Sequence, residues 1–485
     1  MQVSSVNFSD IDLGNRIDAE YFQPTYLHIE EKLIEKHATP LRQFCQITGS
    51  AFYPAATHLY EFGDLPFIRC VDCIPFPAIT KRQDQSFEKI PHGFADAHKN
   101  IKRLRKGEIV ITKVGSPCFA SIIHDLDNVA LSRTVLGLQS IDNINPYYLV
   151  AFLRSKYGFL QLVRERELTI QFQLTLDRVG DILIYKLENT SLEALIAICF
   201  SRYESINRKS EELFEQAQSI LLSELNLNNW QPRHQQSFVK KYSDTEKASR
   251  IDAEYFQPKY EEIITAIKHC ATGHDTLGRL VDIKKSVEVG SSEYLNEGIP
   301  FVRVSNLSPF EMTEEKFISE ELYSLLTLQE PDGVPFEKSK NHQPQQGEIL
   351  LSKDGSPGIA YYLKDKPAKM IPSGGILRLK SKTSKVNQEY LTLVLNSITT
   401  QEQMKRDVGG SIILHWRPEQ VKETLIPILS EAKQAEIQQK VTESFKLREQ
   451  SKHLLECAKR AVELAIEQGE TTAMQWLEME TSTDE

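Results

Sequence analysis

The 485-residue sequence lacks the features that mark membrane and secreted proteins. No apolar run approaches the roughly 20 residues that a bilayer-spanning helix needs. The first ten residues contain neither a basic nor an apolar segment, so no signal peptide is expected. The seven cysteines are odd in number and scattered, which is typical of a reducing compartment rather than of a disulfide framework. We therefore expect a cytoplasmic protein without a membrane segment.

The sequence also lacks the motifs of cofactor-dependent enzymes. It has no Gly-x-x-x-x-Gly-Lys-(Ser/Thr) phosphate loop and no glycine-rich loop that would hold S-adenosylmethionine. Asn145–Tyr148 differs from the Asn-Pro-Pro-Tyr motif of amino-methyltransferases by lacking the second proline, and we interpret it as a helix start with Pro146 near the first position. Glu337–Lys338 lacks the Glu-x-Lys spacing of restriction nucleases. We expect no catalytic residues and no cofactor in this chain.

An excess of positive charge is absent as well. The formal net charge is −10, from 57 basic and 67 acidic residues, which argues against a general polyanion binder. This sum covers the whole chain and says nothing about local surfaces. The remaining composition, 40% hydrophobic and 26% charged, is that of an ordinary globular protein long enough for two to four domains.

What the sequence does contain is a nine-residue segment that occurs twice. Residues 16–24, Arg-Ile-Asp-Ala-Glu-Tyr-Phe-Gln-Pro, recur unchanged as residues 250–258. A tyrosine follows two positions later in both copies, at Tyr26 and Tyr260. An internal repeat of this kind indicates two versions of one structural unit, and the lack of a third copy excludes a solenoid. We predict a pseudo-twofold protein within one chain.

Further landmarks recur in the same order. Leu65–Arg69 matches Ile299–Arg303, and Gly107–Lys113 matches Gly347–Lys353. An x-Gly-Ser-Pro turn follows both Lys113 and Lys353. Short apolar runs broken by Gly and Pro predict strands and loops in these regions. The intervening segments of the two halves share almost nothing, so we expect a common scaffold that carries two different surfaces.

The repeat also bears on metal binding. Cys70 and Cys73 have the spacing of half a zinc site, but a structural site needs four ligands and no second pair is present. Val304 and Leu307 occupy the matching positions of the second half, so we interpret the two cysteines as small buried apolar groups. The histidines considered form no spaced ligand set: His92, His98, His124, His342 and His415. No metal site is predicted.

Each half ends in about 40 residues without Gly or Pro, long enough for a helix of about 60 Å. Apolar residues at seven-residue spacing predict that each helix packs against another helix. The nearest candidate is the long helix of the other half. We expect an antiparallel pair; the alternative is that each helix lies on its own domain. The predicted core of the pair comprises Leu192, Cys199, Ile206, Leu213, Ile220, Ile437, Val441, Leu455 and Val462.

Together these landmarks resemble the specificity subunit of type I restriction–modification systems over nearly the whole chain. The resemblance rests on the order of domain, long helix, domain and long helix. It also rests on the Pro-Phe-(Ile/Val)-Arg and Gly-Glu-Ile-x-x-(Thr/Ser)-Lys-x-Gly-Ser elements of each half. The repeated nonapeptide is similar to the opening of one branch of that family.

The resemblance implies an α+β chain with two pseudo-twofold-related target-recognition domains joined by two long antiparallel helices. The second of these domains is preceded by a polar linker, and the C-terminal tail is expected to fray, with Trp476 able to dock. The expected segments are residues 1–187 for the first domain, 188–228 for the first helix, 229–428 for the linker and second domain, 429–468 for the second helix and 469–485 for the tail.

The same resemblance implies a subunit without catalytic activity that reads a split DNA sequence, one half with each domain. The helices would set the unread spacer and dock two methyltransferase subunits that modify adenine N6. Restriction subunits would complete the complex, and S-adenosylmethionine, ATP and Mg are expected on these partners. Two alternatives stay open: a specificity module of a related restriction or phage-defence complex, and a coiled-coil scaffold that binds no DNA.

Candidate DNA contacts follow from the chemistry of phosphates and base edges, which take Lys, Arg, hydroxyl and amide donors. Arg69 and Arg303 recur in register, so we expect a shared role as a phosphate clamp or scaffold ion pair rather than base reading. Base-reading residues should lie where the halves differ. For any single lysine the alternative is a solvated surface charge. The remaining candidates are Lys81, Arg82, Lys102, Arg103, Arg105, Lys113, Ser116, Lys338, Lys340, Lys353 and Ser356.

Overall fold

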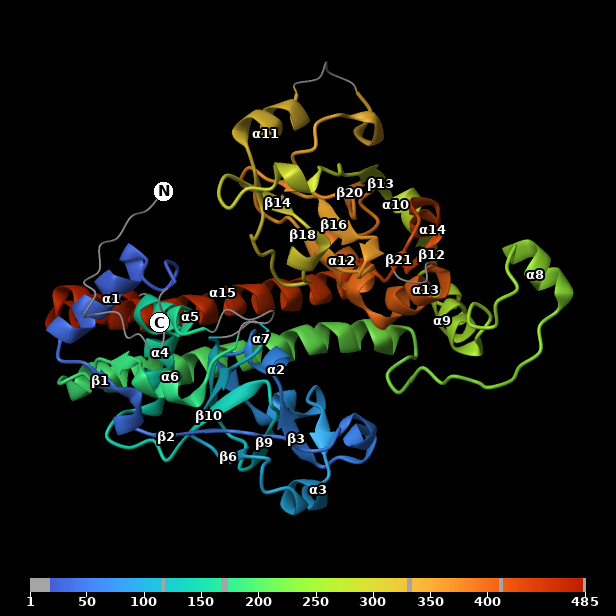
Figure 1. Cartoon of the computed structure of the whole chain (residues 1–485). Helices are drawn as coiled ribbons and strands as arrows, with labels where there is room; N and C mark the ends of the chain where they lie inside the picture. The colour runs from blue at the N-terminus through green and yellow to red at the C-terminus, as the bar shows by residue number, and fades with distance from the viewer. Residues whose placement is uncertain (1–17, 116–117, 167–172, 329–333, 410–412, 483–485) are drawn as a thin grey trace. The chain divides into compact units, whose positions relative to one another are not determined.

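The computed structural model describes residues 18–115, 118–166, 173–328, 334–409 and 413–482 (Figure 1). Ser116 and the first two residues of the first nonapeptide copy lie outside these ranges. Within them, no helix combines the length and the apolar character that a bilayer crossing requires. The chain divides into two compact units: unit 1 is Met1–Arg208 with Arg448–Glu485, and unit 2 is Lys209–Leu447.

Unit 1 is built around two β-sheets. The main sheet has the order β2 (Gln46–Gly49), β10 (Val135–Gln139), β7 (Ile109–Thr112), β8 (Ala120–Ile123) and β4 (Ala78–Ile79). The second has the order β5 (Lys89–Ile90), β3 (Leu65–Ile68), β9 (Val129–Leu131) and β6 (Arg103–Leu104). A small ladder pairs β1 (Thr39–Pro40) with β11 (Leu183–Ile184).

The helices of unit 1 flank these sheets. Those outside the long pair are α1 (Pro24–Glu35), α2 (Cys70–Cys73), α3 (His92–Ala97), α4 (Pro146–Arg154), α5 (Lys156–Arg164), α6 (Leu176–Asp181) and the C-terminal α16 (Glu470–Ser482). Short 3-10 turns lie at η2 (Leu41–Gln43), η3 (Thr57–Phe62) and η4 (Lys81–Gln85). The side chain of Asn145 caps α4 by accepting a hydrogen bond from the amide of Tyr147, and Pro146 is the first helical residue. The interpretation of this stretch as a helix start is confirmed.

Unit 2 repeats the plan. Its main sheet has the order β13 (Val281–Lys285), β20 (Ile376–Ser381), β16 (Ile349–Ser352) and β18 (Ala360–Tyr362), and its second sheet has the order β15 (Phe317–Ile318), β14 (Ile299–Val302) and β19 (Ile371–Pro372). Small ladders pair β12 (His274–Thr276) with β22 (Leu425–Pro427), and β17 (Asp354–Gly355) with β21 (Leu414–His415). Its helices outside the long pair are α8 (Tyr242–Ala248), α9 (Pro258–Lys268), α10 (Leu277–Leu280), α11 (Glu320–Leu326), α12 (Gln388–Asn396), α13 (Ile398–Asp407) and α14 (Pro418–Glu423). Its 3-10 turns are η5 (Ser291–Glu293), η6 (Val304–Asn306) and η7 (Phe336–Lys338).

The two units match strand for strand at their centres. β3 pairs in parallel with β9, and β14 pairs in parallel with β19 in the same register, with Phe67 opposite Ala130 and Phe301 opposite Ile371. β7 and β16 each lie between two antiparallel neighbours and are buried at every position, because their apolar runs face a core on both sides. The prediction of one structural unit present in two versions is confirmed.

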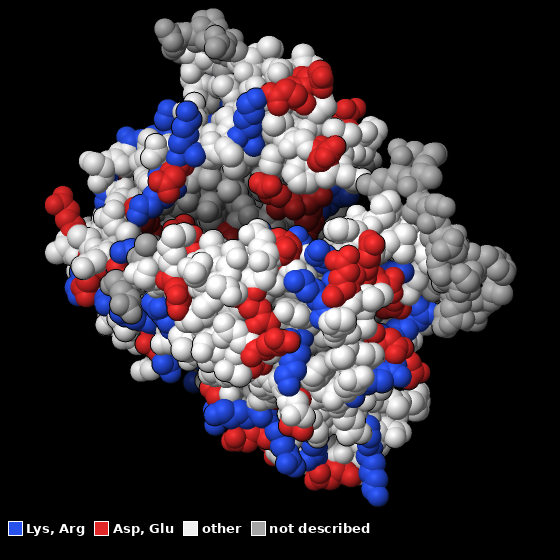
Figure 2. Space-filling model, turned by 90° about the vertical axis from the view of Figure 1, so that its left-hand side faces the viewer, with Lys and Arg blue, Asp and Glu red and all other residues white. Residues whose placement is uncertain are grey.

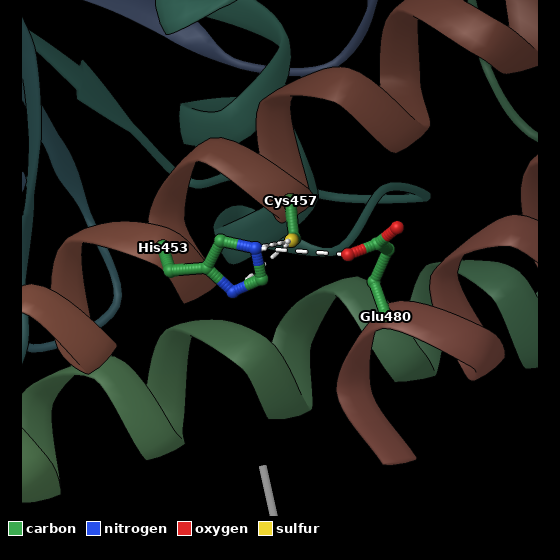
Figure 3. A group of neighbouring side chains, drawn as sticks. All are labelled: His453, Cys457 and Glu480. Atoms are coloured by element: carbon green, nitrogen blue, oxygen red, sulfur yellow. Dashed lines mark hydrogen bonds and ion pairs between the residues drawn. The ribbon is translucent and has the colours of Figure 1, made fainter. Parts of the chain in front are cut away.

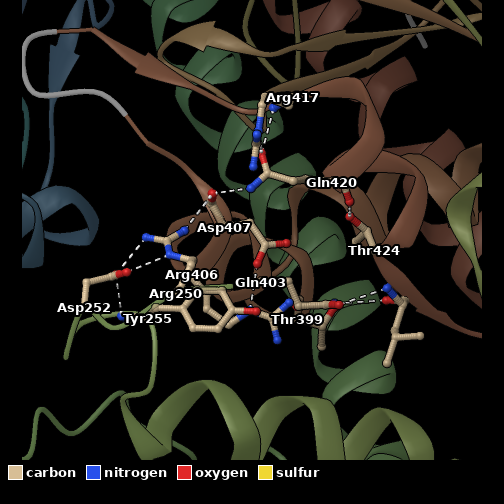
Figure 4. A network of polar contacts seen from close by, with 11 residues as sticks. Arg250, Asp252, Tyr255, Thr399, Gln403, Arg406, Asp407, Arg417, Gln420 and Thr424 are labelled. Atoms are coloured by element: carbon tan, nitrogen blue, oxygen red, sulfur yellow. Dashed lines mark hydrogen bonds and ion pairs between the residues drawn. The ribbon is translucent and has the colours of Figure 1, made fainter. Parts of the chain in front are cut away.

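The repeated nonapeptide folds against the end of the second helix that follows the sheet (Figure 4). In unit 2 the guanidinium of Arg250 pairs with Asp252 at 2.7 Å and lies 4.6 Å from the ring centre of Tyr255. Arg406, near the end of α13, lies 5.3 Å from the same ring, and Arg250 donates a hydrogen bond to the carbonyl of Asp407. The segment therefore clamps the scaffold through stacked charge and aromatic groups.

Unit 1 makes the corresponding clamp with the part of the repeat that is described. Arg164 at the end of α5 lies 4.1 Å from the ring centre of Tyr21, and the Tyr21 hydroxyl donates to Glu165 at 2.7 Å. Burial, together with the carboxylate of Glu165, raises the pKa of Tyr21 well above its usual range. The identity of the two copies is thus explained by a shared packing role.

Two long helices complete the fold: α7 (Thr190–Glu224) and α15 (Glu431–Gln468). Contacts in unit 2 join Ser210 to Ser444, Gln216 to Lys440 and Glu224 to Lys433. Residue numbers rise along one helix as they fall along the other, so the pairing is antiparallel. In unit 1 the first half of α7 shares a hydrophobic core with the second half of α15. The prediction of two long antiparallel helices is confirmed.

Both long helices bury residues at seven-residue intervals. In α15 these are Ile437, Ser444, Ser451, Ala458 and Ala465, and in α7 they are Ile196, Tyr203, Ser210 and Ala217. The buried stripe of α7 is therefore shifted by four residues, about one helical turn, from the stripe expected from sequence. Of the core residues expected from sequence, the buried ones are Leu192, Cys199, Ile437, Val441 and Val462, and the half-buried ones are Ile206, Leu213, Ile220 and Leu455.

The expectation of a frayed tail is wrong. Residues Glu470–Ser482 form helix α16, which begins just after Gly469, a residue with φ of +96° that ends the long helix. Ala473 and Leu477 are fully buried in the core of unit 1, and Trp476 packs partly buried against it. The apolar residues at this spacing provide the packing that stabilises a short helix.

Candidate nucleic-acid interface

Several loops of unit 1 meet at one end of its main sheet. The amide of Cys70, in the loop after β3, donates to the Thr134 hydroxyl at 3.1 Å. The amide of Lys113, after β7, donates to the Thr134 carbonyl at 2.8 Å. The amide of Leu174 in turn donates to the Lys113 carbonyl at 3.1 Å. We call these segments, residues 69–73, 113–115, 132–134 and 173–174, the loop end of unit 1.

Unit 2 has the same construction. The amide of Lys353 donates to the Gly375 carbonyl at 2.8 Å, and the amide of Trp416 donates to the Lys353 carbonyl at 2.8 Å. The amide of Ser373 donates to the Val302 carbonyl at 2.8 Å. The loop end of unit 2 is therefore formed by residues 303–307, 353–358, 373–375 and 413–416, which correspond to those of unit 1.

The two arginines that recur in register hold these loops by ion pairs. Arg69 contacts Asp72 and Glu88, both at 3.4 Å, and Asp72 also accepts a hydrogen bond from the Arg69 amide at 2.8 Å. Arg303 contacts Glu315 at 2.6 Å. Of the two roles expected for this pair of residues, the contacts are those of a scaffold ion pair, with the guanidinium groups already neutralised by carboxylates.

Arg133 in unit 1 is an exposed cation that the sequence analysis did not select. Its guanidinium lies 5.0 Å from the ring centre of Tyr53 and 6.0 Å from that of Phe52, a side chain that is 79% exposed. An exposed arginine supported by aromatic rings suits a phosphate or a base edge. The register of the strands places Gly374 at the corresponding position of unit 2. That difference between the halves was the available sequence signal.

Lys113, the other basic candidate at this loop end, is half-buried, and among the described residues no acidic partner contacts its ammonium group. Unit 2 differs here, because Lys353 pairs with Asp354, which also accepts from His415 Nδ1 at 2.8 Å. Although burial raises the pKa of Asp354, the hydrogen bonds from Lys353 and His415 outweigh that effect and lower it. Ser356 is exposed, and its carbonyl accepts from the hydroxyl of Ser352 at 2.7 Å.

A second basic surface of unit 1 lies along β6. Arg103 pairs with Asp96 at 2.6 Å, whereas Lys102 and Arg105 are exposed and have no acidic side chain within contact in the described part of the chain. The nearby Glu108 is occupied by the amides of Arg105 and Ser140, at 2.7 and 3.2 Å. The charge of this edge is therefore mostly available to an anion.

Lys81 and Arg82 lie elsewhere, on η4. The Lys81 amide donates to Asp125 at 2.6 Å, and its ammonium group lies 3.6 Å from Asp127. Arg82 donates to the carbonyl of Arg208 on α7 at 3.0 Å. These two residues therefore join η4 to its surroundings and lie apart from the loops described above.

The basic candidates of unit 2 lie near a polar pocket. Four lysines line it together with Ser286: Lys284, Lys285, Lys340 and Lys422. Glu337 and Glu419 line it as well, so its charge is partly balanced. Lys338 is exposed, on η7 beside the pocket. Figure 2 shows the same balance on the face that it draws, where basic and acidic side chains are interspersed.

All seven cysteines are buried, and none of them forms a disulfide. Burial raises the pKa of Cys73 well above its usual range, which keeps the thiol protonated, and its Sγ lies 3.5 Å from the Arg69 carbonyl. These contacts agree with the interpretation of Cys70 and Cys73 as packing residues.

No protein-family model matches the chain, and neither does any curated protein sequence. Among solved structures it is similar to the S subunit of a type I restriction–modification system from M. genitalium, with 11% identity over 88% of this chain and 94% of the other and a TM-score of 0.42. It is also similar to the HsdS subunit from Thermoanaerobacter tengcongensis, with 14% identity over 89% and 96% of the two chains and a TM-score of 0.27. A chain from a structure on complex assembly and conformational transition of the type I system has 14% identity over 89% and 97%, with a TM-score of 0.29.

These structures are of the kind that the sequence resembles, and each spans nearly the whole chain.

Proposed function

We propose that this chain is the DNA sequence-specificity subunit of a type I restriction–modification complex. It reads a split DNA target, one half with each unit, and has no catalytic role of its own. The observation that carries the proposal is the pair of matching loop ends with unlike side chains, Arg133 in one unit and Gly374 in the other. One scaffold that presents two chemistries suits an asymmetric bipartite sequence.

Within this proposal the exposed, unneutralised cations of unit 1 contact DNA. Lys102 and Arg105 bind phosphates, which position the protein without reading sequence. Arg133 is placed for a base edge or a phosphate, and Lys113 supports it from the neighbouring loop. The ion pairs of Arg69 and Arg303 hold the loops that carry the reading residues.

The other candidates stay predictions with weaker support. Arg103 and Lys353 are paired with carboxylates, and Lys81 and Arg82 contact their own scaffold. Lys338 and Lys340 lie at the lysine-lined pocket, where a phosphate would find several ammonium groups. Ser356 is exposed beside the loop end of unit 2, and Ser116 lies outside the described residues.

The long helices give the proposal its second element. A stiff helical pair can hold two readers about one turn of B-DNA, or about 34–36 Å, apart, which a flexible linker would not. In this role the pair also docks two adenine-N6 methyltransferase subunits, and restriction subunits join the assembly. S-adenosylmethionine, ATP and Mg belong to those partners.

The test is to coexpress the chain with an adenine-N6 methyltransferase from the same genome and to map methylated adenines across the host genome. The proposal predicts one asymmetric motif with two defined halves and an undefined spacer. If an intact and soluble complex gives a methylation map without sequence enrichment, the proposal is contradicted. A single continuous motif would favour a related complex that uses the module differently.

The net charge of −10 favours a second candidate function, a coiled-coil scaffold that binds no DNA. An acidic subunit gains little from counterion release on its own, so the proposal requires that partners supply much of the phosphate contact. Selection from a random duplex library separates the two functions: the specificity subunit enriches a sequence when its methyltransferase partner is present, whereas a scaffold enriches none.

A further inference from the structure

The C-terminal helices of unit 1 bring together three side chains that bind transition metals in other proteins (Figure 3). His453 and Cys457 are four residues apart on α15, which places both on one face of the helix. Glu480 comes from α16, on the far side of the turn at Gly469. Imidazole, thiolate and carboxylate are the ligand types of zinc sites.

The packing of α16 fixes the third ligand. Ala473 and Leu477 are fully buried in the core that α15 also lines, and Glu480 follows Leu477 by three residues, close to one helical turn. The carboxylate is therefore directed back toward α15, and Figure 3 shows it facing the imidazole.

The spacing of the donor atoms fits one ion. His453 Nε2 lies 3.6 Å from Cys457 Sγ and 3.7 Å from Glu480 Oε2, and all the ligand atoms lie within 4.8 Å of one another. Zinc bonds of about 2.0–2.3 Å at tetrahedral angles place donors about 3.4–3.6 Å apart. Small side-chain adjustments would bring all three donors onto a single ion.

The surroundings give the ion a way in. Cys457 is 3% exposed, whereas the side chains of His453 and Glu480 are 47% and 32% exposed. The thiol thus forms the inner wall, and the other two groups face solvent. A three-ligand set open on one side leaves a fourth position for water.

We propose that His453, Cys457 and Glu480 bind one divalent transition-metal ion, with zinc the best match. The mixed sulfur, nitrogen and oxygen set excludes Mg²⁺ and Ca²⁺, which take oxygen ligands. The ion ties the end of α16 to α15 and stabilises the C-terminal part of unit 1. This site is independent of DNA recognition. The sequence analysis missed it because Glu480 lies on a separate helix, far from the His-x-x-x-Cys pair.

Cobalt titration of the purified, reduced full-length chain tests the proposal. We expect a thiolate-to-cobalt charge-transfer absorption that saturates at one equivalent and is displaced by zinc. Cys457→Ser abolishes the absorption, and His453→Gln or Glu480→Gln weakens cobalt affinity at least tenfold. Cys270→Ser, a buried cysteine of unit 2, and His58→Gln, an exposed histidine, are the matched controls and bind as the unaltered chain does.

A second readout guards against variants that fold poorly. Zinc should raise the midpoint of thermal unfolding of the unaltered chain by several degrees, because a ligand that binds the folded state stabilises it. In His453→Gln, which removes a partly exposed ligand, the midpoint without zinc should be unchanged and the rise with zinc lost. Absence of the absorption at excess cobalt, or its persistence in Cys457→Ser, would overturn the proposal.

Discussion

At the scale of single residues, basic side chains fall into two groups. Those paired with carboxylates belong to the scaffold, and exposed ones without such a partner are candidates for DNA contact. Arg69 and Arg303 recur in the sequence, lie at equivalent loops, and have their charges met by carboxylates. Arg133 does not recur, is exposed, and is stacked on aromatic rings. Recurrence therefore identifies framework residues, and divergence combined with exposure identifies the candidates for reading DNA.

Replacing Arg133 by Ala should weaken DNA binding of the assembled complex by about 1–3 kcal/mol, the usual value of one arginine contact. If Arg133 reads a base, the methylation map loses definition in one half of the motif only. If it contacts a phosphate, affinity falls for all sequences and the salt slope drops by about 1. Filter binding at several salt concentrations measures the affinity and the salt slope, and methylation mapping measures the definition of each half of the motif.

Lys186→Ala is the matched control for this change, because Lys186 is an exposed cation that follows β11, outside the loop end. Equal losses in the two variants would show that Arg133 acts only through net charge.

Asp354 provides a residue-scale prediction on pH. Its pKa is lowered in the folded state, where burial is outweighed by hydrogen bonds from Lys353 and His415. A lowered pKa means that the ionised carboxylate stabilises the fold above the unfolded value of about 3.9, and that this contribution is lost as pH falls through the folded pKa. Urea unfolding between pH 7 and pH 3 should therefore show a shallower acid decline for Asp354→Asn than for the unaltered chain. Parallel declines would contradict the assignment.

At the scale of elements, the long helix pair has a polar centre. The hydroxyl of Ser210 donates to the Ser444 carbonyl at 2.8 Å, and that of Ser444 donates to the Ser210 carbonyl at 2.7 Å. Both residues are fully buried. Small side chains allow the backbones to approach, and the reciprocal hydrogen bonds specify one register, as a buried polar residue can in a coiled coil.

A double-mutant cycle on this pair measures its coupling. Ser210→Ala and Ser444→Ala should each cost about 1 kcal/mol, the net value of a buried hydrogen bond. Because the two hydroxyls also lie 3.1 Å apart, the cycle should give a coupling energy of about 0.5–1 kcal/mol. Ser219→Ala, an exposed serine of α7, is the control and should be neutral. Strict additivity would mean that each hydroxyl acts alone.

The start of α7 depends on the helix that the sequence analysis expected to fray. Glu470 accepts hydrogen bonds from the amides of Glu188 and Asn189, at 3.0 and 2.6 Å, and from the Tyr185 hydroxyl at 2.6 Å. A carboxylate at a helix N-terminus satisfies amide groups and interacts favourably with the helix dipole.

Glu470→Ala should therefore destabilise unit 1 by about 1–2 kcal/mol, as the loss of a helix cap does. Glu478→Ala, an exposed glutamate of the same helix, should have no measurable effect. Urea unfolding followed by circular dichroism compares the two variants. Equal stability would show that the cap is dispensable.

The elements differ in how far sequence alone could predict them. The long helices and the duplicated scaffold follow from helix periodicity and from an exact repeat, which are local signals. The buried stripe of α7 does not, because the half-buried Ile206 and Leu213 are as apolar as buried residues and the fully buried Ser210 carries no apolar signal. The docking of α16 depends on a core assembled from distant segments.

At the scale of the whole molecule, the chain consists of two versions of one unit, and each long helix contributes to both. The sequence predicted the duplication and the antiparallel pair, and it gave each long helix as one undivided segment. Antiparallel pairing gives a different division, because the first half of α7 packs with the second half of α15 in unit 1, and the remaining halves pack in unit 2. Base-reading residues could not be named from sequence, since exposure and charge pairing emerge only on folding.

The central claim is that two unlike units read two different half-sequences. It is tested most directly by replacing residues 24–187 with the corresponding residues 258–429 and mapping methylated adenines in cells that also contain the methyltransferase. The account predicts a palindromic motif in which both halves equal one half of the original target. An unchanged asymmetric motif, from a complex shown to be folded and assembled, would contradict it.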